Sequence, residues 1–404
     1  MGKIDELIKE LCPNGVLTYP LWSLTAWDKK FNAVDKSMQR KIIKYKYLLA
    51  KDLENLIEED GDIRILYTTK DIAFTTEEKA GDFISEGEIV AIPWGGNVSV
   101  KYYKGKFVTG DNRIATSIDT SVLDNKYLFY WMENSIDVIE SFYRGAGIKH
   151  PSMLSVLTLE IPLPPLSIQQ QIVEILDTFT DSISNLQEEL ELREKQMEYY
   201  REKLFDFNED EYEWKYIPEV ASYSTGLTYK PTNISDSGIL VLRSSNIKDN
   251  TLSYDDNVFV QMGIPNRSKI HKNDILICVR NGSKKLVGKC AYISELKYEC
   301  AFGAFMNILR AHSIDSKFLY YSWLLNSTIN QYKGDDAAPI CQITNKDFNR
   351  IKIPVPSLTR QQEIVDILDT FESMIANIKQ EIELRQKQYE YYREKLLNFE
   401  RKKA

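Results

Sequence analysis

The chain has 404 residues, of which 43% are hydrophobic and 27% are charged, an ordinary composition for a soluble globular protein. This composition excludes a disordered, collagenous or low-complexity chain. No stretch approaches the roughly 18 consecutive apolar residues of a transmembrane helix. The net charge of -8, from 51 basic and 59 acidic residues, argues against nucleic acid binding only for the chain as a whole, because segregated basic segments can still bind it.

Cysteine and histidine usage indicates a reducing compartment and gives no metal site. The five cysteines form no C-x-x-C pair, which is typical of free thiols in the cytoplasm. None of the three histidines has a partner at metal-ligand spacing. The acidic N-terminus lacks the apolar region of a signal peptide. The five cysteines are Cys12, Cys278, Cys290, Cys300 and Cys341, and the three histidines are His150, His271 and His312.

The first globular segment, residues 1–160, begins with a short helix predicted within residues 1–16. The stretch from Trp27 to Tyr47 then carries seven basic residues and two acidic ones. Strand-like runs at 89–92 and 98–103, separated by glycines, predict a mixed α and β domain. Aromatic residues among the lysines suit nucleic acid, although filling a core is the more frequent role of any single one.

Residues 161–207 are repeated as residues 353–399, at a constant offset of 192 residues, with about 29 of 47 aligned residues identical. Prolines end a strand-like run in each copy, and Ser167 or Thr359 is then predicted to cap a long helix. Apolar residues follow at heptad spacing and break at Arg193 and Arg385. The seam residues are Ile172, Leu176, Phe179, Ile183, Leu186, Leu190, Ile364, Leu368, Phe371, Ile375, Ile378 and Ile382.

A helix of about 40 residues is a rod of roughly 60 Å, and its narrow apolar seam needs a partner. The other copy is the obvious partner. Globular segments at opposite ends would make the two helices antiparallel about a pseudo-two-fold axis. The alternative is that each helix packs only on its own globular domain. The arginine at each break either pairs with a glutamate to set the register or marks an exposed patch.

The second globular segment, residues 208–352, follows the same plan with different residues. Runs at 240–243 and 275–279 are strand-like, and 315–321 resembles 124–130. Loops after the matched strands carry a glycine turn with flanking hydrogen-bond donors, the side chains that read base edges. The candidate DNA-binding residues are Trp94, Asn97 and Lys101 in the first half, and Arg243, Asn246, Arg280, Ser283, Lys284 and Lys285 in the second.

Catalytic signatures are not found in the sequence. There is no G-x-x-x-x-G-K-[ST] loop and no G-x-S-x-G elbow, and the scattered histidines offer no triad. Asp274 followed by Glu295-Leu-Lys297 could in principle bind Mg²⁺ for phosphodiester cleavage. The first half has no matching Glu-x-Lys, which weakens a nuclease interpretation.

The doubled motif carries a family resemblance. Pro-Leu-Pro-Pro-Leu-Ser-x-Gln-Gln at 162–170 and Pro-Val-Pro-Ser-Leu-Thr-x-Gln-Gln at 354–362 each precede Ile-Val-x-Ile-Leu-Asp. With these motifs the chain resembles the specificity subunits of type I restriction–modification systems over essentially its full length. The N-terminal Glu6-Leu-Ile-Lys-Glu-Leu-Cys-Pro-Asn-Gly-Val16 and Leu240-Val-Leu-Arg-Ser-Ser-Asn-Ile247 add weaker matches.

The resemblance implies an α+β fold. Two mixed α/β target recognition domains, 1–160 and 208–352, would be separated by two long helices in an antiparallel coiled coil. Residues 161–207 would be the central conserved region and residues 353–404 the C-terminal one. The resemblance also implies a cytoplasmic, non-catalytic subunit that reads a bipartite target in double-stranded DNA.

The resemblance further implies partners that carry the chemistry. Two modification subunits would hold S-adenosylmethionine and methylate adenine, and two motor–nuclease subunits, using ATP and Mg²⁺, are optional additions. No cofactor would be bound by this chain. Two alternatives from other classes stay open at this point: a coiled-coil scaffold with two protein-binding heads, and a nuclease built on Asp274.

Overall fold

The computed structural model describes residues 6, 10–69, 71–208, 211–332 and 342–400. Its contacts divide the chain into two compact units, Met1–Gln187 with Glu381–Ala404 and Glu188–Gln380. Each unit therefore combines one globular domain with parts of both long helices. Half of residues 1–16, where a short helix is predicted, lies outside the described residues; Glu6, Glu10 and Leu11 are helical, and residues 12–16 are not. No helix in the described ranges is long and apolar enough to cross a membrane.

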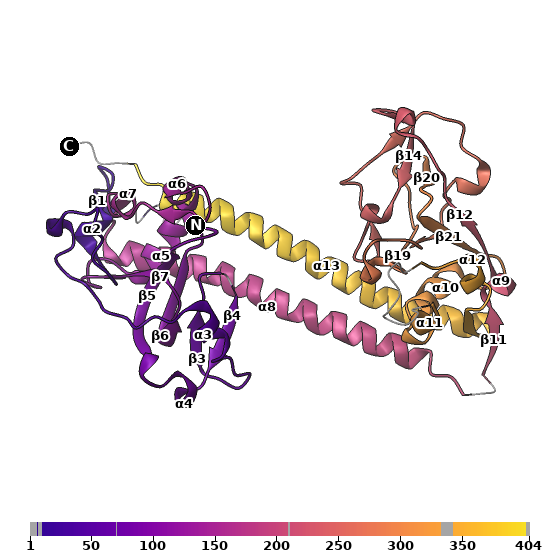
Figure 1. Ribbon diagram of the computed structural model, residues 1–404, viewed down its shortest axis with the longest axis horizontal. Helices are drawn as coiled ribbons and strands as arrows, with labels where there is room; N and C mark the ends of the chain where they lie inside the picture. Colours follow the sequence, from indigo (N-terminus) through magenta and orange to yellow (C-terminus); the bar gives the residue numbers. More distant parts are fainter. Residues whose placement is uncertain (1–5, 7–9, 70, 209–210, 333–341, 401–404) are drawn as a thin grey trace. The chain divides into compact units, whose positions relative to one another are not determined.

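The first unit is built on a six-stranded sheet in the order β2-β7-β5-β6-β3-β4. Figure 1 shows β5, β6 and β7 with α5 beside them. The strands of the first unit are β1 (Thr18–Pro20), β2 (Thr25–Trp27), β3 (Ile63–Leu66), β4 (Ile72–Thr75), β5 (Ser85–Pro93), β6 (Lys101–Thr109), β7 (Asn112–Ser117), β8 (Tyr143–Arg144), β9 (His150–Pro151) and β10 (Glu160–Pro162). Its short helices are α2 (Leu21–Leu24), α3 (Ala50–Glu54), α4 (Glu77–Ala80), α5 (Asn125–Asn134), α6 (Ile136–Ser141) and α7 (Met153–Leu157).

Helix α5 packs against this sheet. Asp124 caps it, because its carboxylate accepts hydrogen bonds from the backbone N–H groups of Lys126 and Tyr127. Leu128 of α5 and Val90 of β5 then meet in one core cluster. The strand expected at 98–103 lies further along the chain, because β6 begins only at Lys101 and continues to Thr109. The packing of α5 against β5 holds β5 in place and so positions the loop that follows Pro93.

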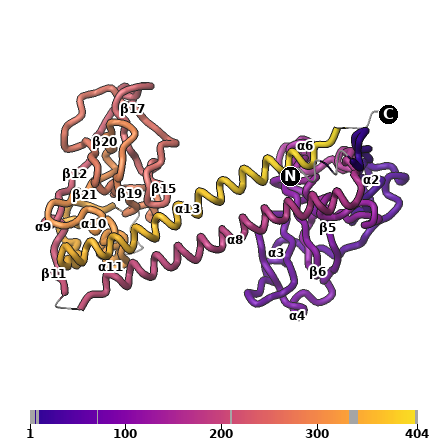
Figure 2. Tube along the Cα trace, turned by 180° about the vertical axis from the view of Figure 1, so that it is seen from behind, coloured from indigo at the N-terminus to yellow at the C-terminus, as the bar shows by residue number. Residues whose placement is uncertain are grey.

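The second unit has two four-stranded sheets, β12-β21-β18-β19 and β13-β17-β14-β20. Its strands are β11 (Tyr212–Tyr216), β12 (Ala221–Thr225), β13 (Ile234–Ser235), β14 (Ile239–Leu242), β15 (Ile247–Lys248), β16 (Thr251–Leu252), β17 (Phe259–Val260), β18 (Ile275–Cys278), β19 (Cys290–Tyr292), β20 (Cys300–Phe302), β21 (Met306–Ala311) and β22 (Lys352–Pro356). Its short helices are α9 (Ile217–Val220), α10 (Ser316–Trp323), α11 (Asn326–Tyr332) and α12 (Asn345–Phe348). Figure 2 shows α10 beside the first turns of α13 (Leu358–Leu397).

The two globular domains share one topology despite their faint sequence similarity. The order β2-β7-β5-β6 in the first unit matches β12-β21-β18-β19 in the second, with every neighbouring pair antiparallel. Helices α5 and α10 follow the matched strands β7 and β21. The loop after β5 therefore corresponds to the loop after β18, as the sequence plan predicts.

The expected segment boundaries at 160/161 and 352/353 fall inside strands. Strand β10 pairs with β1, and β22 pairs with β11. Both strands therefore belong with the globular domains, and the long helices begin a few residues later. Helix α8 spans Leu166–Leu204 and α13 spans Leu358–Leu397. The predicted caps Ser167 and Thr359 thus lie in the first turn, and Ser357 accepts the hydrogen bond from the backbone N–H of Arg360 instead.

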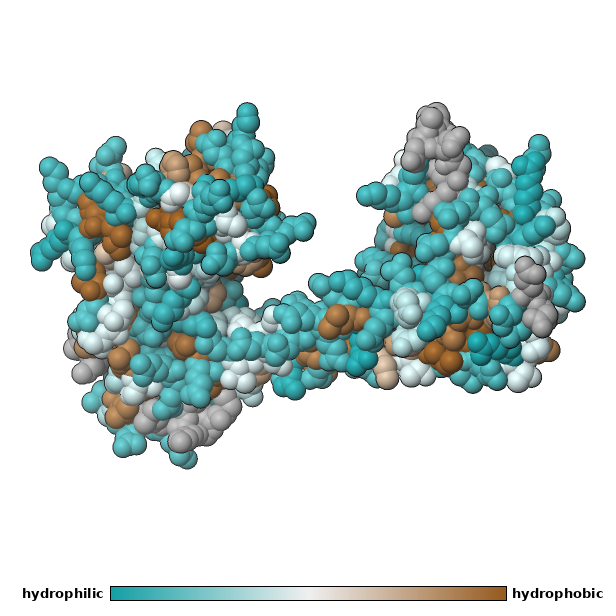
Figure 3. All heavy atoms as spheres, turned by 90° about the horizontal axis from the view of Figure 1, so that it is seen from below, coloured by the Kyte–Doolittle hydropathy of each residue, from teal (hydrophilic) through white to brown (hydrophobic). Residues whose placement is uncertain are grey.

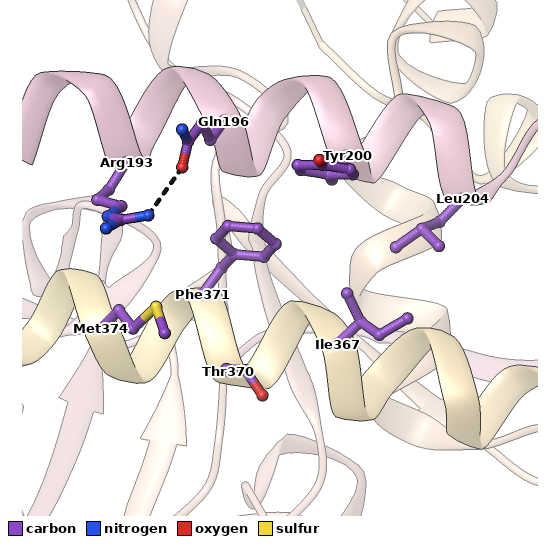
Figure 4. Close-up of a pocket in the computed structure, with 8 residues that line it drawn as sticks. All are labelled: Arg193, Gln196, Tyr200, Leu204, Ile367, Thr370, Phe371 and Met374. Atoms are coloured by element: carbon purple, nitrogen blue, oxygen red, sulfur yellow. Dashed lines mark hydrogen bonds between the residues drawn. The ribbon is translucent and has the colours of Figure 1, made fainter.

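The two long helices pair in antiparallel fashion inside each unit. In the first unit Phe179 of α8 stacks on Tyr392 of α13, with ring centroids 5.3 Å apart. In the second unit Tyr200 stacks on Phe371 at 5.4 Å. Figure 4 shows the rings of Tyr200 and Phe371 between the two helices of the second unit. The same aromatic pair, with its helices exchanged, therefore recurs in both units.

Both expected packing modes of the seam occur. At its N-terminal end each helix packs on its own domain, because Ile172 and Leu176, like Ile364 and Leu368, are fully buried in domain cores. The eight remaining seam residues, Phe179, Ile183, Leu186, Leu190, Phe371, Ile375, Ile378 and Ile382, are half-buried. A two-helix pair buries only a narrow stripe, which explains this partial burial.

The arginines at the seam breaks each pair with a glutamate, as one of the two alternatives expects, but the glutamate belongs to the same helix. Arg193 donates to Glu189 and Gln196 of its own helix, and Arg385 donates to Glu381 and Gln388 of its own. Both arginines are therefore held by intrahelical pairs one turn away on either side. Among the described residues, no ion pair joins either arginine to the other long helix.

Candidate nucleic-acid interface

In the first unit, the loop after β5 is held against the segment before β9. The backbone N–H of Gly96 bonds to the carbonyl of Lys149, and the Nδ1–H of His150 donates to the Trp94 carbonyl at 2.8 Å. A Cβ on Gly95 would lie 2.8 Å from Ile148, so glycine permits this close approach. Gly96 has φ of +94°, a left-handed conformation that favours glycine. The close contact at Gly95 and the positive φ of Gly96 therefore explain why glycine occupies both positions of the predicted turn.

Trp94 lies at the centre of a charged and aromatic cluster. The guanidinium of Arg113 lies 3.9 Å from the centroid of the Trp94 ring, and Arg113 pairs with Asp111 at 2.9 Å. Lys29 reaches the same Asp111 at 3.4 Å and lies 3.9 Å from the centroid of the Tyr47 ring. The cluster joins the basic stretch 27–47 to the loop after β5. The sequence shows that basic stretch but does not predict Arg113 beside Trp94 or Lys29 beside Asp111.

The pKa values of Asp28 and Lys101 are both shifted by burial. Burial raises the pKa of Asp28 to about 6, against the opposing effects of the Ile114 backbone N–H and of Arg113 and Lys29. Burial, aided by nearby Arg64, lowers the pKa of Lys101 to about 8. The Lys101 ammonium donates to the Tyr67 carbonyl and to Asn112. Its ammonium is therefore held within the domain in this structure, and DNA binding by Lys101 stays a prediction.

In the second unit, two predicted loops meet. The Asn281 amide donates to Ser244 Oγ at 3.2 Å, which ties the loop after β18 to the loop after β14. Arg280 is exposed and lies beside the exposed ring of Phe305, 5.4 Å from the ring centroid. The backbone of Arg280 also forms an antiparallel bridge to Gln342. A surface of guanidinium, amide and hydroxyl donors next to an aromatic ring is suited to phosphates and base edges.

The candidate DNA-binding residues differ in how far they reach solvent. Asn97, Arg280, Ser283 and Lys285 are exposed, and Trp94, Lys101, Arg243 and Lys284 are half-buried. Arg243 forms an ion pair with Asp256 at 2.7 Å. Asn246 is 0% exposed, and its amide binds the Arg243 N–H and the carbonyls of Ser253 and Asp256. In this structure Asn246 shapes the loop, and base reading by its side chain stays a prediction.

Asp274, the basis of the nuclease alternative, is committed to structural contacts. It is 1% exposed and binds the Arg310 guanidinium through two hydrogen bonds of 2.7 and 2.8 Å. One of its oxygens also accepts from the backbone N–H of His271. This carboxylate closes the turn before β18 and pairs with β21. Its geometry explains the acid at this position without a metal.

Comparison with known proteins identifies the duplicated domain. A family model described as "Type I restriction modification DNA specificity domain" matches residues 32–193 and again residues 209–384. The chain is thus a protein with two DNA specificity domains.

The chain belongs to the family of type I restriction–modification specificity subunits. It is 31% identical over 305 residues to the EcoR124I/EcoR124II specificity subunit of Escherichia coli, covering 71% of this chain and 74% of the relative. A putative specificity subunit of Haemophilus influenzae is 28% identical, with 78% and 84% covered. Subunits of this family confer DNA sequence specificity and are not catalytic.

Solved structures share the fold. The S subunit of a type I restriction–modification system from M. genitalium aligns with a TM-score of 0.62 at 19% identity, over 94% of this chain and 96% of that one. A chain from a structure on complex assembly of a type I system aligns with a TM-score of 0.52 at 16% identity, over 86% and 96%. The predicted fold class of two mixed domains and two long helices is confirmed.

Proposed function

We propose that each globular domain reads one half of a bipartite duplex DNA target, through the loop after β5 in the first domain and the loop after β18 in the second. One observation carries this proposal. The two loops occupy the same place in a shared topology, yet Trp94-Gly-Gly-Asn97 stands in one and Arg280-Asn-Gly-Ser283 in the other. Equivalent loops with different side chains suit the reading of two different base sequences.

The proposal includes the partners that supply the chemistry. Two modification subunits, carrying S-adenosylmethionine, would methylate adenine in the target, and motor–nuclease subunits would add ATP- and Mg²⁺-dependent restriction. The complex would work in the cytoplasm. This chain would bind none of these cofactors. Pure chain incubated with S-adenosylmethionine and duplex DNA is therefore expected to give no methylation and no cutting, and turnover by the chain alone would refute this division of labour.

Substitutions in the loop after β18 test the proposed reading surface. We expect Arg280→Ala and Ser283→Ala to cost about 1–3 kcal/mol of specific binding where they contact bases, and to relax one half-site only. Where Lys285 contacts phosphate, Lys285→Ala should weaken binding to all sequences and lower the salt slope by about one. Binding is measured on duplex DNA at several salt concentrations with the chain assembled with its modification subunits.

Lys272→Ala is the matched control for these substitutions. Lys272 is also exposed, but it precedes β18 and so lies at the opposite end of that strand. Its removal changes the net charge by the same amount as removal of Lys285. Equal effects of Lys272→Ala and Lys285→Ala would show a diffuse charge effect and refute the assigned loop. Failure to detect salt-dependent binding to duplex DNA would favour the alternative of a protein-binding scaffold.

A further inference from the structure

The repeated Gln-Gln pair contains one buried glutamine in each unit. Gln169 of α8 is 0% exposed: its oxygen accepts from the backbone N–H of Asp124, and its nitrogen donates to the carbonyls of Val122 and Pro164. Gln361 of α13 is 1% exposed. It repeats this pattern with the backbone N–H of Asp315 and the carbonyl of Pro356, both at 2.9 Å. Each glutamine thus ties a long helix to the capping residue of α5 or α10.

An aspartate eight residues later makes a second tie to the same helix. Asp177 accepts from the hydroxyl of Tyr130 at 2.6 Å and from the ammonium of Lys126 at 2.8 Å. Burial, together with the bond to Asp177, raises the pKa of Tyr130, so its hydroxyl stays protonated and donates. In the second unit Asp369 accepts from Tyr321 at 2.7 Å and from Lys317 at 2.6 Å.

The glutamine and aspartate contacts together restrain α5 or α10 on its long helix more than either contact alone would. Eight residues span about 12 Å of helix and lie about 80° apart around its axis, within one broad side of the helix. A single contact would let α5 pivot on α8, whereas two contacts separated along the axis oppose both rotation and sliding. The neighbouring glutamine is not used in this way, because Gln170 is exposed and Gln362 bonds to Asp366 of its own helix.

The tied helix also supports the reading loop. In the first unit, Tyr127 and Leu128 of α5 share a core cluster with Val90 and Ile92 of β5, and β5 leads directly to Trp94. A continuous packed path therefore runs from α8 through α5 and β5 to that loop.

The second unit contains the same path. Phe318 and Leu319 of α10 share a core cluster with Ile275 and Ile277 of β18, which leads to Arg280. Here the path runs from α13 through α10 and β18 to the reading loop. Each loop is thus connected by packed side chains to the helix that its domain is tied to.

We infer that the buried glutamine and the aspartate after it, Gln169 with Asp177 and Gln361 with Asp369, are positioning residues that fix the direction of each reading loop relative to its long helix. They thereby set how strictly the complex discriminates the spacer length between the two half-sites. This inference rests on the proposed bipartite recognition. The ties are made between side chains and backbone of one unit, so their loss should change spacer tolerance and leave the half-site sequences unchanged.

The test is a library of duplex targets with randomised half-sites and spacer lengths, offered to the full chain assembled with its modification subunits and scored by methylation. Gln169→Met removes the amide at similar length, and Tyr130→Phe removes a single hydroxyl. Gln170→Met is the matched control. We expect methylation at spacers one base pair longer or shorter to rise roughly tenfold in both variants, relative to the preferred spacer, which corresponds to about 1.4 kcal/mol. Tyr321→Phe should act likewise through the other domain.

Broader spacer use by Gln169→Met and Tyr130→Phe with unchanged half-sites, and not by Gln170→Met, supports the inference. Lower total methylation with the spacer distribution of the unmodified chain indicates a merely stabilising role and overturns it. If Gln169→Met does not fold, the spacer distribution of the milder Tyr130→Phe variant decides between these two outcomes. An unmodified chain that selects no bipartite sequence at all overturns the proposed function, and this inference with it.

Discussion

At the residue scale, the partners of a side chain decide whether it can read DNA. Asn246 and Arg280 both follow strands of the second domain and both carry amide or guanidinium donors. The donors of Asn246 are spent on backbone carbonyls within the domain, whereas Arg280 is exposed next to Phe305. Substitutions at the two positions should therefore separate folding from recognition.

We expect Asn246→Ala to lower the free energy of unfolding by roughly 1–3 kcal/mol, because it leaves buried backbone groups of the loop without their partners. Arg280→Ala should leave this free energy nearly unchanged, since an exposed side chain is removed. Urea denaturation of both variants measures the difference. A stability loss at Arg280 equal to that at Asn246 would contradict the separation of roles.

Asp28 predicts a pH dependence of stability. Its pKa is raised from 3.8 to about 6 by burial, so the folded chain holds this proton more tightly than the unfolded chain does. Asp28 therefore favours folding at low pH, and this contribution is lost as the pH rises from 3.8 to about 6. Asp28→Asn should stabilise the protein at pH 7 by up to about 3 kcal/mol and have little effect near pH 4. Thermal unfolding at both pH values tests this, and destabilisation at pH 7 would contradict it.

The sequence predicted the turns after β5 and β18 better than the partners of the side chains around them. Glycine turns and strand ends depend on local residue types, so Gly95-Gly96 and Asn281-Gly282 are visible in the sequence. The inward turn of Lys101 depends on Tyr67 and Asn112, and Trp94 meets Arg113 only through the pairing of β5 with β7. These partners lie on other strands, beyond the reach of a local pattern.

At the element scale, one heptad pattern serves two different environments. Ile172 and Leu176 are buried by a domain core, while Ile183 and Leu186 are half-buried between two helices. Apolar residues at these spacings satisfy both environments, so the pattern predicted the helices and their pairing but not where the core ends. Apolar side chains consequently reach the surface of the helices, as the brown patches along them in Figure 3 show.

The stacked aromatic pairs should stabilise the two-helix segments. We expect Phe179→Ala to lower the free energy of unfolding of the first unit by roughly 1–2 kcal/mol, through loss of its stacking on Tyr392 and of buried apolar area. Phe371→Ala should act similarly in the second unit, where its partner is Tyr200. Ser184→Ala, at an exposed position of α8, is the control. Hydrogen exchange should quicken in the paired helix of the altered unit, and equal exchange in all three variants would show that the pairs contribute nothing.

At the scale of the whole molecule, the chain contains the same architecture twice, a globular domain followed by a long helix. The repeat is obvious in the helices, where residue identity is high, and faint in the sequences of the globular domains, which share the strand order of one sheet and the helix α5 or α10 with its aspartate cap. Each core cluster among the described residues draws on a single unit. Strand order depends on apolar pattern and turn position, so the loops of each domain can differ freely while the fold is kept.

Because each domain has its own core, we expect that the recognised half-sites can be exchanged one at a time. Replacing residues 208–352 by the equivalent segment of another specificity subunit should change one block of the methylated target and leave the other block as it is. The replaced segment must keep the contacts that Gln361 and Asp369 make with α10, because the junction with α13 depends on them. A donor with an aspartate cap and a tyrosine six residues later, like Asp315 and Tyr321, is therefore the suitable choice, and a donor that lacks the tyrosine is its control. Methylation mapping of genomic DNA reads out both blocks. A change in both blocks by the matched donor would show that the two domains do not read DNA independently.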